Sequence, residues 1–161
     1  MNKDRKKRLI NLGAESLAEE LLKLANQDDT VDDLVNRLIA TTTENIQRFK
    51  KKLAKIKRSK RFVRWGESAG LARELETMLQ ELKAGVDDPR TGTELVAAFY
   101  KTDKYTLGNC DDSSGHVGDV YSLDAKELFL HYARRVSDTN WLENLILKLN
   151  QDDDYGVRDA L

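Results

Sequence analysis

The sequence contains one serine in a setting typical of a nucleophile, Gly66-Glu67-Ser68-Ala69-Gly70. This is the Gly-x-Ser-x-Gly spacing of the nucleophile elbow, in which two glycines allow a strained strand-to-helix turn that exposes the serine. Asp103 with His116 or His131 could follow it in the order of a catalytic triad. A hydrolase of this type needs a parallel sheet, however, and helical patterns flank the motif on both sides. A serine esterase around Ser68 is therefore only the third functional hypothesis, and small residues at a helix start explain the motif better.

One cysteine and two histidines are the candidates for metal binding or Cys/His chemistry. They fall short of a closed zinc site, and Cys110 has no second cysteine with which to form a disulfide within the chain. On one predicted helix, His116 and His131 would stand about 22 Å apart, too far to share a metal or a proton. We expect His131 to pack on an amphipathic face and Cys110 to be a small loop or core residue. The sequence therefore predicts no metal, no cofactor, no small-molecule substrate and no enzymatic activity.

Acidic residues cluster before several predicted helices, where a carboxylate can accept hydrogen bonds from free N–H groups. One cluster loosely resembles a calcium loop that would include Asp119, but glycine stands at the fifth position instead of the sixth and the closing glutamate is missing. We predict that this cluster is a structural motif at a helix start. Its residues are Asp111, Asp112, Ser113, Ser114 and Gly115.

The largest charged feature is a segment from Arg48 to Arg64 that has ten basic residues and no acidic one. The net charge of −1 hides it, because the rest of the chain carries 17 basic and 28 acidic residues. Such a segment could neutralise phosphates, while Phe62 and Trp65 stack on unpaired bases. The residues expected to contact a nucleic acid or another partner are Arg48, Lys51, Lys52, Lys55, Arg58, Arg61, Arg64 and Trp65.

The same segment also has a structural interpretation, which the sequence leaves open. Ile46, Phe49, Leu53 and Ile56 follow one another at helical steps, so one side of this helix packs. The lysines would then solvate the other side or pair with acidic residues of adjacent helices, and the two aromatic side chains would anchor the following turn in the core. An anionic membrane surface is a less favoured alternative.

Apolar residues recur at steps of three and four along the whole chain and do not alternate as in strands. This pattern predicts an all-α fold of about eight helices without a sheet. Thr41 and Glu44 have capping-box spacing, and Gly85 followed by Asp88-Pro89 ends a helix. The predicted helices carry their apolar residues over 12–24, 31–39, 46–56, 71–82, 95–100, 117–132 and 141–149, with an eighth starting near Tyr155. We expect the sixth to start near Ser113 or Ser114 and to run to about Val136.

Residues 17–29 and 142–153 share a pattern of a leucine-rich helix, the letters Asn-Gln-Asp-Asp, and the start of another helix. A helix–turn–helix unit of this kind buries its apolar face only by stacking on neighbours. The echo therefore indicates a repeat architecture, an α-α superhelix of stacked helical hairpins.

Four stretches resemble a bacterial family of longer proteins that is classed as a domain of unknown function and is similar to helical-repeat proteins of the TPR and HEAT kind. They are residues 12–17, 58–65, 111–120 and 153–159, of which Asp111-Asp112-Ser113-Ser114-Gly115 is the most specific. The resemblance covers nearly the whole chain. It implies an α-α superhelix that continues beyond Leu161, and it carries over no activity and no catalytic residue.

We therefore expect residues 1–161 to form a single helical-repeat domain, the N-terminal part of a longer superhelix. No apolar run approaches the ~20 residues of a membrane span, and the polar start of the chain lacks a signal sequence, so we expect a cytoplasmic protein. The predicted function is a non-enzymatic scaffold that binds a protein or peptide. The alternative is a nucleic-acid-binding module that uses the basic helix 48–64.

Overall fold

The computed structural model describes residues 2–159 and 161, and all regular secondary structure among them is helical. This confirms the predicted all-α fold, and the described residues contain no sheet; one isolated bridge joins Val63 to Cys110. The chain divides into two compact units, Met1–Thr41 and Thr42–Leu161, which are described separately below.

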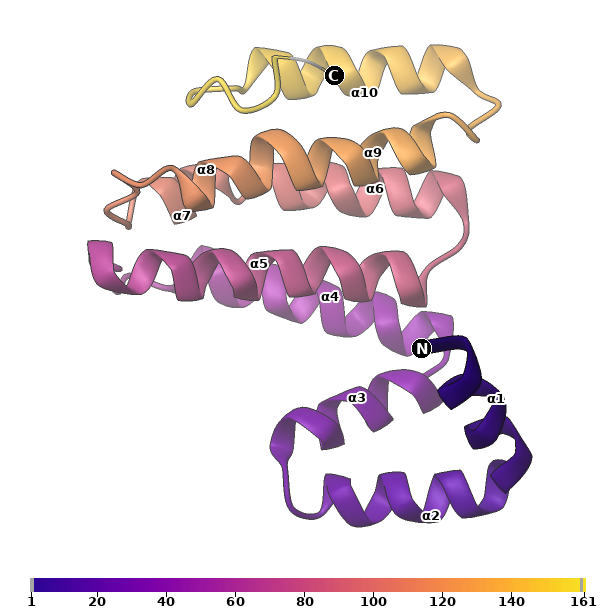
Figure 1. Cartoon of the computed structure of the whole chain (residues 1–161). Helices are drawn as coiled ribbons and strands as arrows, with labels where there is room; N and C mark the ends of the chain where they lie inside the picture. Colours follow the sequence, from indigo (N-terminus) through magenta and orange to yellow (C-terminus); the bar gives the residue numbers. More distant parts are fainter. Residues whose placement is uncertain (1, 160) are drawn as a thin grey trace. The chain divides into compact units, whose positions relative to one another are not determined.

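The N-terminal unit contains three helices, which Figure 1 shows in indigo to purple. They are α1 (Asn2–Leu12), α2 (Ala14–Ala25) and α3 (Asp29–Ile39). The sequence analysis joined Leu12 to the helix that follows it, which was wrong. Gly13 has a φ of 87°, a left-handed backbone that ends α1 and starts a new helix.

The helices of the N-terminal unit bury little apolar surface. Asp28 caps α3 by accepting a hydrogen bond from the Thr30 amide at 2.8 Å. Ala25 is the only buried hydrophobic residue among those described in this unit, whereas most of its leucine and isoleucine side chains are half exposed or more. The unit therefore has helices and caps but scarcely a core of its own.

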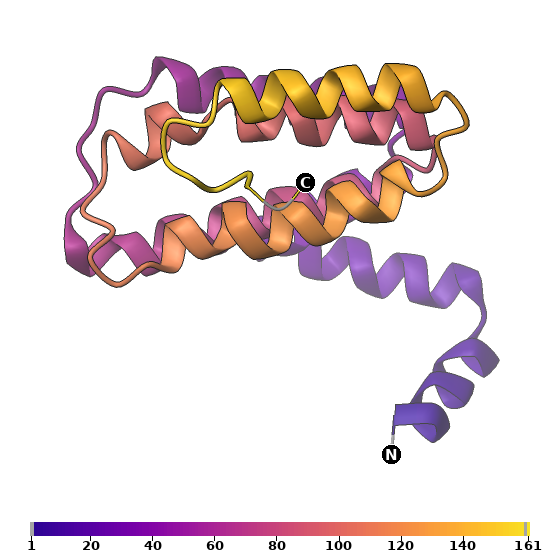
Figure 2. The same cartoon turned by 90° about the horizontal axis from the view of Figure 1, so that it is seen from above.

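The C-terminal unit holds the remaining elements. They are α4 (Thr42–Arg58), α5 (Trp65–Gly85), α6 (Pro89–Tyr100), α7 (Asp103–Leu107), α8 (His116–Asp119), the π-helix η1 (Val120–Ala125), α9 (Lys126–Ala133) and α10 (Thr139–Gln151). Seen from above, these helices form two layers, with α4, α6 and α10 in one and α5, α8 and α9 in the other (Figure 2). The core between the layers is built from large apolar and aromatic side chains, including the stacked rings of Phe99 and Tyr121, whose centroids lie 4.9 Å apart.

The turn between α5 and α6 is fixed at several points. Asp88 caps α6 by accepting from the Thr91 amide at 2.8 Å, and Pro89 occupies the first turn, as the sequence predicts. The hydroxyl group of Tyr132 on α9 lies 2.6 Å from the Val86 carbonyl oxygen, which brings the ring against α6. A Cβ on Gly92 would come within 2.3 Å of that ring, so only glycine allows this close approach.

The sixth predicted helix is real but interrupted. It begins at His116 instead of Ser113 or Ser114, because Gly115 has a φ of 77° and the Asp112 carboxylate accepts from the amides of the next turn. The middle stretch, η1, is π-helical, and the hydroxyl of Tyr121 within it lies 2.7 Å from that of Thr102. The helix ends at Ala133, earlier than predicted.

The prediction of an eighth helix near Tyr155 was wrong. Residues 152–159 form turns, because Gly156 has a φ of 66° and the Asp153 carboxylate accepts hydrogen bonds from the amides of Val157 and Arg158. Of the two similar stretches, residues 142–153 thus form a helix followed by turns, whereas residues 17–29 continue into α3. Every described helix is too short or too polar to cross a membrane.

Candidate functional site

Helix α4 carries two stripes of opposite character. Phe49 and Leu53 are buried, and Ile46 and Ile56 pack partly against the same core. A cation follows each of these four residues at a distance of two positions. In a helix of 3.6 residues per turn, two positions correspond to a rotation of about 200°, so the cations lie on the side opposite the buried stripe. We call this second set the outer stripe; it consists of Arg48, Lys51, Lys55 and Arg58, all exposed.

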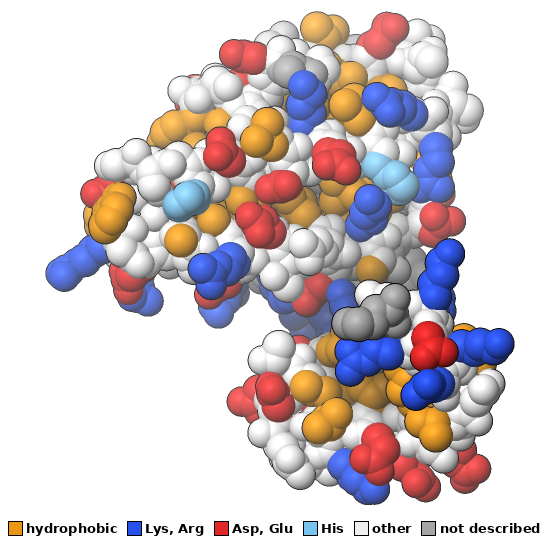
Figure 3. All heavy atoms as spheres, in the orientation of Figure 1, with side chains coloured by type: hydrophobic (Ala, Val, Ile, Leu, Met, Phe, Trp, Pro, Cys, Tyr) orange, Lys and Arg blue, Asp and Glu red, His pale blue; other side chains and the backbone are white. Residues whose placement is uncertain are grey.

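Two carboxylates meet the basic segment directly. Glu81 on α5 pairs with Lys52 at 2.6 Å, and Glu67 pairs with Arg61. Within the described part of the chain, the structure gives no ion pair to any of the four outer-stripe cations. Glu44 lies at the N-terminal end of the same side of α4. In Figure 3, Lys and Arg side chains gather along the edge of the C-terminal unit where α4 and the start of α5 lie.

Residues 59–64 link α4 to α5, and the backbone of Val63 holds this link in place. The Val63 amide donates to the Asn109 carbonyl at 2.8 Å, and the Asp111 amide donates to the Val63 carbonyl at 2.8 Å. Val63 is half-buried. Since successive side chains of an extended chain point to opposite sides, its neighbours Phe62 and Arg64 point outward.

Both aromatic side chains of this segment lie in solvent. Phe62 is 57% exposed and Trp65, the first residue of α5, is 63% exposed. The expectation that they anchor the turn in the core was therefore wrong. The bridge gives the inward position to Val63, next to Phe62, and Trp65 lies at the exposed start of α5. We call residues 59–65 the aromatic segment; it adjoins the C-terminal end of the outer stripe.

Ser68 has no nucleophile setting. It lies inside α5, is 1% exposed, and donates a hydrogen bond to the Trp65 carbonyl at 2.8 Å. Gly66 and Gly70 are helical positions with open space beside them. The esterase hypothesis around Ser68 was wrong, because the motif forms the first turns of a helix and not a strand-to-helix turn.

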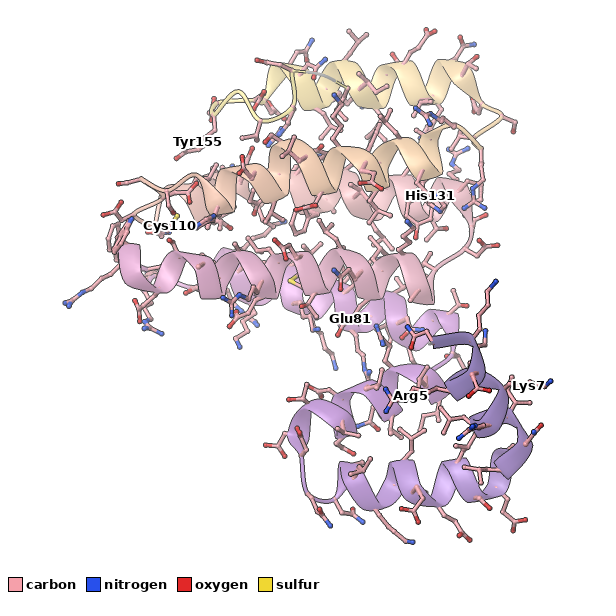
Figure 4. The ribbon with its side chains drawn as sticks, viewed as in Figure 1. Arg5, Lys7, Glu81, Cys110, His131 and Tyr155 are labelled. Carbon is pink, nitrogen blue, oxygen red and sulfur yellow. The ribbon has the colours of Figure 1, made fainter. Side chains whose placement is uncertain are left out.

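The cysteine and the histidines are not assembled into a site. Cys110 and His131 lie at opposite ends of the C-terminal unit (Figure 4), and both histidines are exposed, so the predicted packing of His131 was wrong. Burial and the neighbouring Asp112 and Asp111 raise the pKa of the Cys110 thiol, which keeps it protonated at neutral pH. The described residues hold no group of three metal-ligating side chains.

The acidic motif before α8 organises the start of that helix. The Asp112 carboxylate accepts from the Val117 amide at 2.9 Å and from the Gly118 amide at 2.8 Å, while Asp111 accepts from the amide and hydroxyl of Ser113. The hydrogen bonds from the hydroxyl and amide of Ser113 lower the pKa of Asp111. Residues 109–111, which lead into this motif, bind the backbone of Val63 and so position the aromatic segment.

A shallow acidic groove lies between α5 on one side and η1 and α9 on the other, within one layer. Its volume is about 360 Å³, and its lining includes Glu76, Asp124 and Glu127. Burial and these two glutamates raise the pKa of Asp124. The acidic groove and the basic outer stripe thus lie in different layers of the C-terminal unit.

Sequence reasoning missed the buried ion pair of Arg158 and Asp103. The Arg158 guanidinium is 2% exposed and lies 2.7 Å from the Asp103 carboxylate. Asp103 is therefore a structural counter-ion and does not orient a histidine. The signal was the Asp153 carboxylate four and five residues before Val157 and Arg158, which was interpreted as a helix start instead of a turn.

Comparison with known protein families identifies the family of this chain. The model of a family described as "Family of unknown function (DUF6880)" matches residues 3–161. No curated protein and no solved structure matches the chain.

Proposed function

This chain belongs to DUF6880, a family of unknown function, and we propose from its geometry that it is a non-enzymatic scaffold of helical-repeat type that holds an anionic partner against the outer face of α4. We also propose that the protein is bacterial and cytoplasmic and that its fold is similar to those of TPR and HEAT proteins.

The arrangement of the C-terminal unit supports a repeat scaffold. The pairs α4/α5 and α6/α9 each place one helix in either layer, and α10 adds a further helix beside α6 (Figure 2). Each pair buries its apolar face against its neighbours, which is how stacked helical repeats make long binding surfaces. The side chains that could do chemistry serve as packing and capping groups here.

The observation that carries the proposal is the outer stripe. Four cations follow one another over about 15 Å of a rigid helix, on the side opposite the buried stripe. Internal pairing would have neutralised them, yet two carboxylates that meet this segment, Glu81 and Glu67, pair with Lys52 and Arg61 instead. A stripe of like charges is relieved when a polyanion replaces the small counter-ions around it.

The test is binding of two anionic probes, heparin and poly-L-glutamate, followed by fluorescence anisotropy over a salt series. A variant with all four outer-stripe residues changed to glutamine should bind at least tenfold more weakly, because it loses four cations that would replace counter-ions of the polyanion. A matched control changes four exposed cations elsewhere in the C-terminal unit to glutamine. They are Lys83, Lys101, Arg134 and Lys148.

The control variant has the same net charge as the outer-stripe variant, so it should bind like the wild type. Equal loss in both variants would show that net charge alone decides binding and would overturn the proposal. Lack of binding by the folded wild type at low salt would also overturn it.

A further inference from the structure

We infer that the anionic partner is single-stranded nucleic acid, with phosphates along the outer stripe and bases stacked on Phe62 and Trp65. This inference rests on the proposed function and adds the class of the partner. It is carried by a second observation that charge alone does not explain, the exposure of two aromatic rings at the end of the basic helix.

The two rings have the surroundings of a stacking platform. Phe62 is 57% exposed and Trp65 is 63% exposed, although burying such side chains is among the largest gains in folding. Arginines precede both rings in the sequence, Arg61 before Phe62 and Arg64 before Trp65. A surface for an apolar protein segment would surround the rings with other apolar side chains, whereas cations beside exposed rings are typical of sites that bind single strands.

The rings are held ready for binding by the backbone. Two hydrogen bonds of 2.8 Å fix Val63 between Asn109 and Asp111, so the aromatic segment is not a free loop. The Glu67 carboxylate accepts from the Arg64 amide at 3.2 Å and pairs with Arg61, which orders the entry into α5. A ligand therefore needs little ordering of the protein, which favours affinity.

The length of the surface matches a short single strand. The outer stripe spans about 15 Å along α4, and Phe62 follows Arg58 by four residues, at most about 14 Å of extended chain. A surface of this length falls in the range of site sizes of roughly 4–16 nucleotides for a single-strand binding module.

The rings also distinguish between anionic partners. In a duplex the base faces are stacked on one another and offer no surface to Phe62 or Trp65, and a glutamate-rich peptide has no aromatic faces at all. Unpaired bases offer a face to each ring. Acidic side chains also adjoin this surface, namely Glu44 on α4 and Glu67 and Asp111 beside the aromatic segment. Glu67 pairs with Arg61, and Asp111 accepts hydrogen bonds from Ser113.

The experiment compares three labelled probes by anisotropy over a salt series: a twelve-residue oligothymidylate, a duplex of the same length, and poly-L-glutamate. The proteins are the wild type, the outer-stripe glutamine variant, the double variant Phe62→Ala with Trp65→Ala, and Tyr155→Ala as an aromatic control. Tyr155 is 45% exposed and lies in the C-terminal turns, outside the aromatic segment.

The wild type should bind the oligothymidylate at least tenfold more tightly than the other two probes. The double aromatic variant should lose about tenfold per ring for the oligothymidylate alone, with its salt dependence unchanged. Each phosphate contact of a single strand contributes about −0.7 to the slope of log K against log salt. The outer-stripe variant, which loses four cations, should therefore have a slope that is less steep by about 3. Tyr155→Ala should match the wild type.

Intrinsic fluorescence gives an independent readout. The chain has two tryptophans, and Trp141 is half-buried beneath the Arg90 guanidinium at 4.5 Å from its ring. In a Trp141→Phe background, oligothymidylate should quench the remaining emission of Trp65, while poly-L-glutamate should leave it unchanged.

Two results separate this inference from the proposed function. If all three probes bind equally and the double aromatic variant binds as the wild type does, the anionic scaffold stands and the single-strand inference is wrong. If no probe binds the folded protein, both fail. Because both rings are exposed, the double variant should keep the melting temperature of the wild type, so loss of binding would not reflect unfolding.

Discussion

At the scale of single residues, Arg158 makes three buried hydrogen bonds that join separate helices. Its guanidinium donates to the carbonyls of Leu149 and Tyr100, each at 3.0 Å, and to the Asp103 carboxylate at 2.7 Å. These acceptors lie at the C-terminal ends of α10 and α6 and at the start of α7. One side chain from the C-terminal turns thus holds three helix ends together.

Replacing Arg158 by methionine should lower the free energy of unfolding by about 3–5 kcal/mol, because Asp103, 2% exposed, would be left buried without its counter-ion. Urea denaturation measures this change. The double variant Arg158→Met with Asp103→Asn should recover part of the loss. Arg135→Met breaks the exposed pair with Asp87 and the hydrogen bond to the Asp87 carbonyl oxygen. It should cost about 1 kcal/mol, and a loss equal to that of Arg158→Met would contradict the prediction.

Asp88 gives a pH-dependent prediction. Hydrogen bonds from the Thr91 amide and then from its side chain lower the pKa of Asp88 in the folded state. Its contribution to stability is therefore complete above the unfolded pKa of 3.8 and is lost as pH falls through the lower folded pKa. Asp88→Asn should be less stable than the wild type at pH 7, and the difference should shrink below about pH 4. Urea denaturation at several pH values would contradict this if the difference stayed constant.

At the scale of helices, the sequence was informative wherever burial follows a local pattern. The steps of three and four residues from Ile46 to Ile56 identified the packed side of α4, and with it the cations on the opposite side. The Asp88-Pro89 pair identified the start of α6. Both features depend only on residues that are close together along the chain, so they can be predicted from a single sequence.

The orientation of the aromatic segment could not be predicted in this way. It depends on hydrogen bonds between Val63 and residues 109–111, which lie far away in the sequence. The outward position of Phe62 follows from that bridge, whereas Trp65 is exposed at the first position of α5. The buried position of Arg158 depends likewise on Asp103, 55 residues earlier.

Two glycines should respond oppositely to alanine. Gly92→Ala places a Cβ 2.3 Å from the Tyr132 ring where α6 meets α9, and should destabilise the protein by roughly 1–3 kcal/mol. Gly70→Ala on α5 meets nothing within 4 Å and should stabilise it by about 0.5–1 kcal/mol through helix propensity. Thermal unfolding compares them, and destabilisation by both substitutions would argue against the open space at Gly70.

At the scale of the whole molecule, the two units differ in how much they bury. The C-terminal unit encloses nearly all of the described core, from Phe49 to Leu149. In the N-terminal unit, Leu12, Leu38 and Ile39 are each more than 60% exposed. Since apolar burial is the main source of stability, the two units should contribute very unequally to it.

Residues 42–161 produced alone should therefore unfold cooperatively, whereas residues 1–41 alone should be largely unfolded, because a helical unit of this size needs a packed core. Far-ultraviolet circular dichroism during heating measures both. A cooperative transition in the 1–41 peptide at low concentration would contradict this prediction.

The π-helical stretch Val120–Ala125 has a consequence for changes in chain length. In a π-helix each amide bonds to the carbonyl five residues back, so the turn takes up one residue more than an α-turn. A relative that lacks one residue here would form an unbroken α-helix and still direct Val117 and Phe129 into the core. Deletion of a single residue, which elsewhere rotates the rest of a helix off its packing face, should thus be tolerated within Val120–Ala125.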